Sequence, residues 1–578
     1  MARAFQSPHW TLLSLRPLLA AVTLLAFLAP ARAEVVVYTA ALIRTMDPES
    51  PTATAVAVED GQIVAVGTEE SLQDWLDKGA RVDRRFAEQV ILPGFIDPHV
   101  HPSLPAVLTQ LPFLAPDDWV LPTGNFPGET TPKGYRKRLK ELASAHSDPS
   151  VPFITWGYHP LWHGEIWRED LNAWFGEQPV LLWHRSFHEL IGNDSAWDLL
   201  GVTEADAEMV DGADWERGHF YENGLRAVVP KLGFLFSPER FGRGMMNFLA
   251  MLHQAGVTTA LDMGTGIYGN PAGEIAGVRA AANAYPVPVR LILTPIIVDF
   301  MTRGKSPEEA LAEIRSWQTA NDERVSVGNH FKLMIDGAIF SGLAQMGPPG
   351  YLDGHEGVWM VPEPALRAYA EVFWQAGFQL HAHANGDAAV DRFLRLIEGL
   401  SRDFPRPDHR STIEHLAYSR EAQSEQLAAL GAQASVNPYY HYILSEAYSG
   451  DWLGPDRARH MTRLGSLERA GVPLTLHSDA PMAPLSPLTL VWAASERETI
   501  SGAAGLATER LSRESALRAV TAGAAEVIGR VHEIGSIRVG MRADFVVLEA
   551  DPMTVPGDQL RQLRVQATVF AGETYPVL

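Results

Sequence analysis

The sequence contains no cysteine among its 578 residues. Disulfide bridges, thiolate metal ligands and a cysteine nucleophile are therefore all excluded. Any bound metal ion would have to be held by histidine, by carboxylates or by rarer ligands.

Positive charge is also scarce. The chain has 47 lysines and arginines against 69 acidic residues, which gives a formal net charge of -22. This balance argues against nucleic acid or an anionic membrane surface as a partner. Only seven of the basic residues are lysines, and no lysine follows Lys332.

Long apolar runs are missing apart from a short one near the N-terminus. Residues 18–28 are apolar, Arg3 and Arg16 precede or flank them, and "ARA" at 31–33 offers small residues for cleavage. The run is too short to span a bilayer comfortably, so we predict that residues 1–33 are a signal peptide. An uncleaved membrane anchor is the alternative. We expect a secreted or periplasmic protein with no stable membrane insertion after cleavage.

Short β-rich segments occur at both ends of the remaining chain. Residues 34–88 contain Asp60-Gly61 between two apolar runs, which is a strong hairpin signal. Residues 531–578 again read as short strands separated by turns. We predict that the two ends together form one small β-sandwich.

Strand and helix patterns alternate between these ends. The strand candidates are residues 89–97, 257–263, 288–296, 330–337, 378–384, 410–417, 432–438 and 472–480. Eight β-α units predict an α/β fold, a distorted (β/α)8 barrel built from residues 89–103 and 241–530. The gap at residues 104–240 is too long for a loop, so we expect an inserted α+β subdomain there.

Chemically competent side chains fall at the carboxyl ends of the predicted strands, where barrel enzymes place their reacting groups. In "PGFIDPHVH", His99 and His101 share one face of an extended strand. His383, His415 and Asp479 follow the fifth, sixth and eighth strands. A single histidine at a strand end is more often structural. Four histidines and one carboxylate at the same end of the strands favour a zinc site.

Lys332 lies in "HFKLMIDG", a strand expected to be buried. Burial lowers the pKa of a lysine, and a neutral amine can take up carbon dioxide as a carbamate that bridges two metal ions. In a chain so poor in lysine, this position suggests that the amine is needed. The alternative is a lysine paired with a neighbour such as Asp336.

Five segments together resemble the metal-dependent amidohydrolase superfamily, and specifically its YtcJ-like branch: "PGFIDPHVH", "FKLMIDGAIF", "HAHANGDAAVD", "STIEHLA" and "HSDAP". The resemblance covers nearly the whole chain after residue 33. It implies a one- or two-metal centre, usually zinc. By that resemblance His99, His101 and Asp479 would hold the more buried metal, and His383 and His415 the second, with carboxylated Lys332 between them.

The sequence departs from the branch around the expected substrate pocket. "SFH" replaces "DGH" but keeps His188, and "HANGD" stands where "HAIGD" is more usual. His477 takes the place of the glycine before "SDAP", and Asn437-Pro438 replaces "QP". The expected metal residues are all retained, so the changes bear on the substrate and not on hydrolysis.

A mechanism follows from these expectations. Asp479, beside both metal and water, is the natural general base and later the proton donor to the leaving group. His188 is a candidate oxyanion donor or, equally, a structural histidine. Tyr158 and Trp162, in an aromatic-rich stretch, are candidate substrate contacts, although packing is the commoner role of any one aromatic. The role of Glu222 is open, and a surface carboxylate is the alternative.

The leading hypothesis is an exported hydrolase that cleaves an amide or N-acyl C–N bond in a small, hydrophobic or aromatic molecule. An ester or lactone hydrolase is the chemical alternative, because the same activated water attacks either carbonyl. A non-catalytic exported binding protein is a third class, against which the retained ligands argue. We expect one or two zinc ions per chain, and a homodimer is possible.

Overall fold

The computed structural model describes residues 34–450 and 452–577. The predicted signal peptide, residues 1–33, lies outside the described residues. Within them, parallel strands alternate with helices as expected of an α/β protein. Among the described residues, no helix combines the length and apolar character required to cross a membrane.

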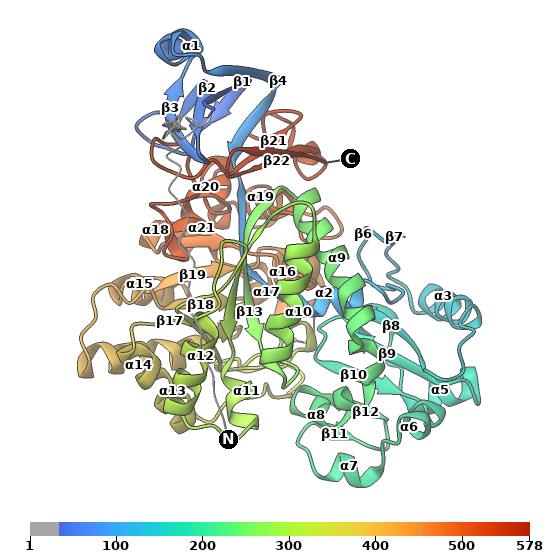
Figure 1. Ribbon diagram of the computed structural model, residues 1–578. Helices are drawn as coiled ribbons and strands as arrows, with labels where there is room; N and C mark the ends of the chain where they lie inside the picture. The colour runs from blue at the N-terminus through green and yellow to red at the C-terminus, as the bar shows by residue number, and fades with distance from the viewer. Residues whose placement is uncertain (1–33, 451, 578) are drawn as a thin grey trace, which may run out of the picture.

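Strands from both ends of the chain form one seven-stranded sheet, at the top of Figure 1. Its order is β23-β22-β21-β4-β1-β2-β3, with bounds β1 Val36–Arg44, β2 Thr52–Glu59, β3 Gln62–Gly67, β4 Arg81–Pro93, β21 Phe545–Leu548, β22 Val565–Phe570 and β23 Glu573–Pro576. Asp60 and Gly61 turn β2 into β3 with φ of 50° and 74°, which a two-residue hairpin turn requires. Side chains of both ends share one apolar core, as in the contact of Tyr38 with Phe545.

The strand predicted at residues 89–97 is divided between two sheets, which corrects the predicted domain boundary. Pro93 in β4 pairs with Phe545 in the terminal sheet, and the strand that enters the centre of the molecule is β5, Phe95–Val100. Gly94 makes the transition, and a Cβ on it would overlap the side chain of Thr258. The apolar run at residues 89–92 fits a buried strand in either sheet, so the sequence does not reveal the division.

Two sheets of parallel strands form the centre of the molecule. The first has the order β15-β14-β13-β5 and the second β16-β17-β18-β19-β20. The bounds are β13 Val257–Thr265, β14 Arg290–Pro295, β15 Val325–Val327, β16 His330–Met334, β17 Gln379–Ala384, β18 Thr412–His415, β19 Gln433–Val436 and β20 Leu474–Leu476. Parallel bridges Val100–Ala480 and Ile296–Lys332 connect the two sheets at both edges. The carboxyl ends of all these strands therefore face the same side.

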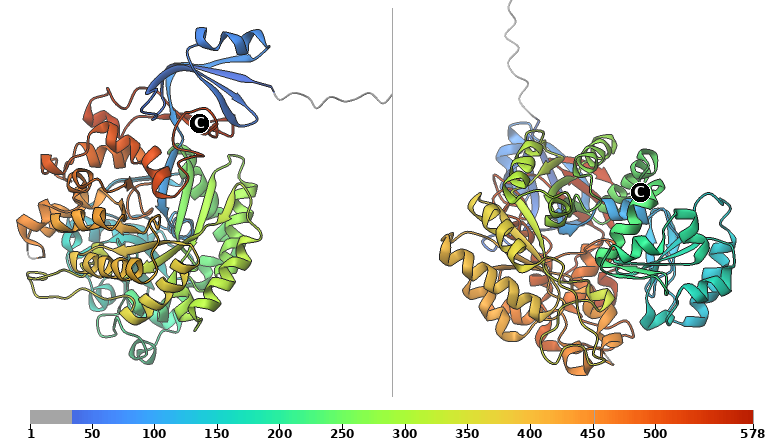
Figure 2. Two further views of the ribbon diagram at one scale, coloured as in Figure 1. Left: turned by 90° about the vertical axis from the view of Figure 1, so that its left-hand side faces the viewer. Right: turned by 90° about the horizontal axis from the view of Figure 1, so that it is seen from below.

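Helices cover the outside of these strands (Figures 1 and 2). The longer ones are α9 Pro238–Gln254, α10 Pro271–Ala284, α12 Pro307–Gln318, α13 Glu363–Gln375 and α14 Asp387–Asp403. In α14 the buried positions include Val390, Phe393 and Ile397, which recur at helical spacing on one face. Helices connect most of these strands to the next parallel strand, whereas β15 is followed directly by β16.

Residues between β5 and α9 form a separate layer at the lower right of Figure 1. Its sheet has the order β11-β12-β10-β9-β8, with bounds β8 Phe153–Tyr158, β9 Val180–His184, β10 Glu189–Gly192, β11 Ala213–Asp214 and β12 His219–Tyr221. Helices α3 Pro132–Ser144, α5 Arg168–Phe175 and α6 Asp194–Leu200 flank it. Trp156 and Trp183 are fully buried in this region, so part of its aromatic content serves packing.

Candidate metal centre

The residues predicted to bind metal meet at the carboxyl ends of the central strands. His101, Lys332, His383, His415 and Asp479 line one cavity of about 60 Å³. His99 lies beside them on β5 and is fully buried. A larger cleft of about 840 Å³ lies between α9 and α10, but it contains none of these side chains. The chemistry of the donors therefore identifies the smaller cavity as the candidate site.

Asp479 lies within reach of both histidines of the first motif. Its Oδ1 atom is 3.0 Å from His101 Nε2 and 3.3 Å from His99 Nε2. The backbone of Asp479 has a φ of 54°, and its N–H donates to the carbonyl of His99 at 2.9 Å. This unusual conformation for a non-glycine residue turns the carboxylate toward the imidazoles.

His415 joins the second pair of imidazoles to the first. Its ring centroid is 4.4 Å from that of His383 and 4.6 Å from that of His99. The hydroxyl of Tyr440 lies 3.2 Å from His415 Nδ1 and donates to Asp479 Oδ2 at 3.3 Å. Nε2 of His383 lies 2.9 Å from Nδ2 of Asn385, in the altered "HANGD" segment, and 3.4 Å from the carbonyl of Gly337. In the tautomer that donates Nε2–H to this carbonyl, Nδ1 of His383 is the potential ligand atom.

Lys332 is buried among these ligands. Its Nζ atom is 3.4 Å from His99 Nε2, and burial lowers the pKa of its ammonium to about 8. The alternative pairing with Asp336 is wrong, because that carboxylate instead accepts backbone N–H groups of Asn385 and Gly386 at 2.9 Å each. The lysine instead faces His99, and the carboxylates whose charge acts on it are Glu414, Asp479 and Asp262.

Glu414 fixes the orientation of His99 from the interior. His99 Nδ1 donates to Glu414 Oε2 at 2.7 Å, and His381 Nδ1 donates to Oε1 at 2.7 Å. A further contact of 3.0 Å connects His381 Nε2 with His330 Nδ1. Burial raises the pKa of Glu414 to about 7. With Nδ1 engaged in this way, Nε2 of His99 is left for a metal ion.

Asp97 holds the two metal-binding segments together. Its carboxylate accepts the backbone N–H groups of His99 and Ser478 at 3.3 Å each. The hydroxyl of Ser478 also donates to Asp97 Oδ2 at 2.5 Å. One buried carboxylate thus sets the separation between the "HVH" and "HSD" segments.

His188 and Glu222 form a pair at the wall of the cavity. His188 Nδ1 donates to Glu222 Oε2 at 2.7 Å, while Glu222 Oε1 accepts the N–H of Ala338 at 3.0 Å. Burial lowers the pKa of His188, but the charge and hydrogen bond of Glu222 outweigh it and the net shift is upward. Glu222 is 7% exposed, so its interpretation as a surface carboxylate is wrong.

Two predicted substrate contacts lie elsewhere. Tyr158 is buried in the inserted region, where its hydroxyl donates to the carbonyl of Gly164 at 2.8 Å and accepts the N–H of Ile166 at 3.0 Å. Trp162 packs against His159 with ring centroids 4.6 Å apart. Neither residue lines the cavity beside Asp479. The aromatic stretch made them candidates, but its hydrophobic area is used inside the subdomain.

No contact with the metal ligands was predicted from the sequence for Glu414, Tyr440 or His477. The carboxylate in "STIEHLA" could have indicated Glu414, because a carboxylate in a buried parallel strand needs a polar partner. The two-residue spacing of His381 and His383 repeats that of His99 and His101 and is another. Nothing in the sequence alone indicates where the ring of His477 points.

The donor atoms fit a metal ion. Two groups have ligand atoms within 4.8 Å of one another: His99, His101 and Asp479, and His99, His415 and His477. In the described part of the chain, His101 Nδ1, Asp479 Oδ1 and His477 Nε2 are buried and have no hydrogen-bond partner. Imidazole nitrogen and carboxylate oxygen are ligands that zinc prefers when thiolates are absent.

Comparison with known proteins gives the same assignment. A model of the amidohydrolase family matches residues 87–575. The chain belongs to the amidohydrolase family. It is 25% identical over 564 residues to an N-substituted formamide deformylase of Arthrobacter pascens, covering 92% of this chain and 96% of that one. It is also 23% identical over 551 residues to the putative amidohydrolase YtcJ of Bacillus subtilis strain 168, covering 92% and 97%.

A solved structure supports the fold. An uncharacterized metal-dependent hydrolase from Pyrococcus horikoshii superposes with a TM-score of 0.69 at 19% identity, covering 91% of this chain and 100% of that one. The resemblance to YtcJ-like amidohydrolases is thus confirmed. As a family member, the chain is a metal-dependent hydrolase of carbon–nitrogen bonds.

Proposed function

We propose that the chain is an exported, zinc-dependent hydrolase that cleaves the amide or N-acyl bond of a small, hydrophobic or aromatic molecule. Its central strands would form the distorted (β/α)8 barrel of the superfamily. The observation that carries the proposal is the convergence of His99, His101 and Asp479, with Asp479 Oδ1 buried and unpartnered.

The ligands support one or two zinc ions. His99, His101 and Asp479 would hold the first, and His383 and His415 the second. Lys332, as a carbamate formed with carbon dioxide, would lie between them, which its burial and its 3.4 Å approach to His99 support. When bound, zinc would lower the pKa of a water molecule toward about 7, and it would also polarise the substrate carbonyl.

Asp479 would transfer the proton of the attacking water to the leaving group. The hydroxyl of Tyr440 engages Oδ2, so Oδ1 remains to take the proton of the attacking water and to return it to the leaving amine. His188 would donate a hydrogen bond to the oxyanion of the substrate, and Glu222 would hold the imidazole in place. Asp479 and His188, the two groups that would act on water and substrate, both line the cavity.

The rest of the cavity wall favours an apolar substrate group. Its remaining lining is mainly aliphatic, sulfur-containing or aromatic: Leu104, Phe187, Met263, Ile267, Ile296, Met334 and Met482. Such a wall gains free energy by covering apolar surface and offers few partners to a charged substituent. N-substituted formamides, the substrate class named for one relative, are therefore reasonable first test compounds.

The test measures metal content and activity together. Purified protein would be analysed by elemental mass spectrometry and assayed against N-substituted formamides, N-acyl amino acids, aryl amides and lactones, before and after chelation. We expect one or two zinc ions per chain and amide cleavage that chelation removes and zinc restores. Faster cleavage of lactones than of any amide would favour the ester or lactone hydrolase.

A chain that binds no metal after reloading would overturn the proposal in favour of a binding protein. Export and subunit number are separate parts of the proposal. N-terminal sequencing of protein from an expressing host tests cleavage after residue 33, and light scattering distinguishes a monomer from a homodimer.

A further inference from the structure

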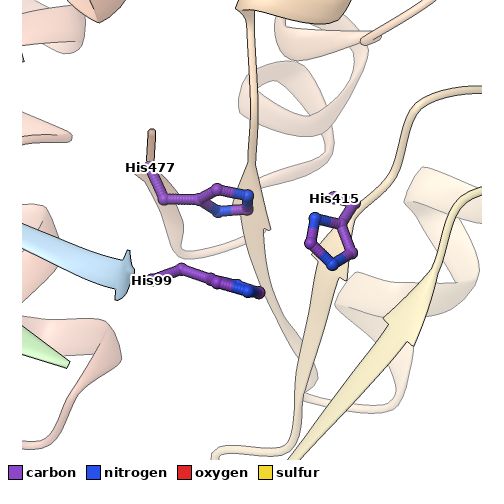
Figure 3. Close-up of side chains that lie close together, drawn as sticks. All are labelled: His99, His415 and His477. Carbon is purple, nitrogen blue, oxygen red and sulfur yellow. The ribbon is translucent and has the colours of Figure 1, made fainter. Parts of the chain in front are cut away.

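His477 lies directly after β20, in the interior of the central strands, where the family resemblance leads us to expect glycine. Its side chain is fully buried. Its ring centroid is 4.5 Å from that of His99 and 5.3 Å from that of His415. Figure 3 shows the three rings together, with His477 lying over His99 and both extending toward His415.

One nitrogen of His477 is fixed by the protein and the other is not. Nδ1 lies 2.7 Å from the hydroxyl of Ser435 on β19, which holds the ring in one orientation. Nε2 is buried and has no hydrogen-bond partner in the described residues. Leaving a buried polar atom unsatisfied is unfavourable. A side chain that only filled this space would not need that nitrogen.

We propose that His477 is a further imidazole ligand of the metal centre, and that it binds the ion held by His99, whose ring is the nearer of the two. The ligand atoms of the three residues lie within 4.8 Å of one another, close enough to surround one ion. The proposal rests on the metal-dependent function proposed above and deepens it. Three neutral imidazoles suit zinc and neighbouring divalent transition metals better than magnesium or calcium.

The carboxylate of Glu414 near His477 supports a role for His477 as a metal ligand and not as a proton donor in catalysis. His477 Nδ1 is 3.7 Å from Glu414 Oε2, the same carboxylate atom that accepts from His99 Nδ1. Glu414 thus anchors His99 directly and lies close to His477, whose Nδ1 contacts Ser435, and Nε2 of each ring faces the other way. A carboxylate behind a ligating imidazole is the usual second contact of histidines that bind zinc.

The test replaces His477 and observes the metal directly. The variants are His477→Gly, which introduces the residue expected from the family resemblance, and His477→Gln, which keeps polarity and most of the volume. The matched control is His409→Gln, because His409 is also buried but has both nitrogens engaged, by the carbonyl of Leu430 and the N–H of Ser411. Circular dichroism and thermal unfolding establish that each variant is folded.

Zinc affinity by chelator competition and X-ray absorption of the zinc-loaded protein give readouts that are independent of activity. We expect both His477 variants to lose one imidazole from the zinc coordination shell. Their dissociation constant should rise about 100-fold or more, since even partners one step removed from the metal change affinity by about 10- to 100-fold. His409→Gln should leave both quantities unchanged.

The outcomes separate this inference from the proposed function. If wild type and His477→Gln bind zinc equally and show the same number of imidazoles, His477 is not a ligand, while the metal-dependent hydrolase stands. If wild type binds no zinc at all, the proposed function and this inference both fail. Should His477→Gly not fold, the folded Gln variant decides the question.

Discussion

Glu414, which is buried, and Glu189, which is partly buried, each connect two imidazoles, yet of these two only Glu414 lies beside the metal ligands. Glu414 accepts from His99 and His381 at 2.7 Å each. Glu189, in the inserted region, lies 2.7 Å from His219 Nε2 and 3.3 Å from His184 Nδ1. The local chemistry is the same, but the surroundings differ.

The difference lies in what else contacts each imidazole. His99 Nε2 faces Asp479 and Lys332, whereas the contact that accompanies Glu189 at His184 is the hydroxyl of Ser186, 2.8 Å from the same Nδ1 atom. Both groups of potential metal ligands found in residues 34–450 and 452–577 include His99, and neither includes a histidine of the inserted region. Clustered histidines therefore mark a metal centre only where their unengaged atoms face one another.

The pKa values of the two carboxyl groups differ as well. Burial raises the pKa of Glu414 to about 7. Burial acts in the same direction on Glu189, but the charges of His184 and His219 and the hydrogen bond from His219 outweigh it, and its pKa lies below the usual range. Glu189 is thus stabilised as an anion by its histidines, in an arrangement that needs no further partner.

The largest expected effect comes from Asp479→Asn. This change keeps the shape but removes the base, so kcat/KM should fall by about 10²- to 10⁴-fold, the usual contribution of a general acid–base. Steady-state kinetics on the best amide of the panel measure it, with circular dichroism as the control for folding. Activity within a factor of two of wild type would remove Asp479 from the mechanism.

Lys332→Ala tests the carbamate. Zinc content should fall by about one ion per chain, and activity by about 100-fold or more, because a direct ligand is lost where outer partners cost about 10- to 100-fold. Added formate, acetate or propionate should restore part of both, by replacing the missing carboxylate. A Lys332→Ala protein with normal zinc content would show that Lys332 does not bridge.

Replacing Glu414 and Glu189 with glutamine, one at a time, tests whether only Glu414 supports metal binding. Glu414→Gln should weaken zinc binding by about 10- to 100-fold, because His99 loses the partner that leaves Nε2 for the metal. Glu189→Gln removes an equivalent bridge and should leave zinc affinity unchanged while lowering the unfolding temperature. Equal zinc affinities in the two variants would contradict the distinction drawn between them.

The smallest expected effect is a change in pH dependence. His188 donates most strongly when protonated, so activity should decline as pH rises through its pKa, which Glu222 holds above the usual range despite burial. Glu222→Gln removes that support, so the decline should begin at lower pH. A kcat/KM profile records it, and an unshifted alkaline limb would mean that His188 does not act as a cation.

Much of the site follows from sequence because it depends on short motifs at strand ends. His99, His101, His383, His415 and Asp479 were each placed by a strand pattern followed by a polar side chain, and the structure brings them together. Substrate contacts were harder to predict. Tyr158 and Trp162 lie in a sequence rich in aromatics, and only tertiary packing decides which of these rings reaches a cavity.

Contacts between residues far apart in the sequence were also not predicted. The contact of Glu414 with His99 joins residues 315 positions apart, so no local spacing reveals it. The division of residues 89–97 between β4 and β5 has the same cause, since the β21 partner of Pro93 comes from the other end of the chain. Strand periodicity gives the existence of an element but not which sheet it joins.

The position of β4 has a consequence for how the protein is made. β4 leads into the strand that carries His99, and it pairs with β1 on one side and with β21 on the other. Because translation proceeds from the N-terminus, β1 and β4 are made well before β21. Until β21 has been made, β4 therefore presents an unpaired edge, the kind that invites association with other chains. A protein cut short before residue 545 would lack this edge partner for the strand that leads to His99.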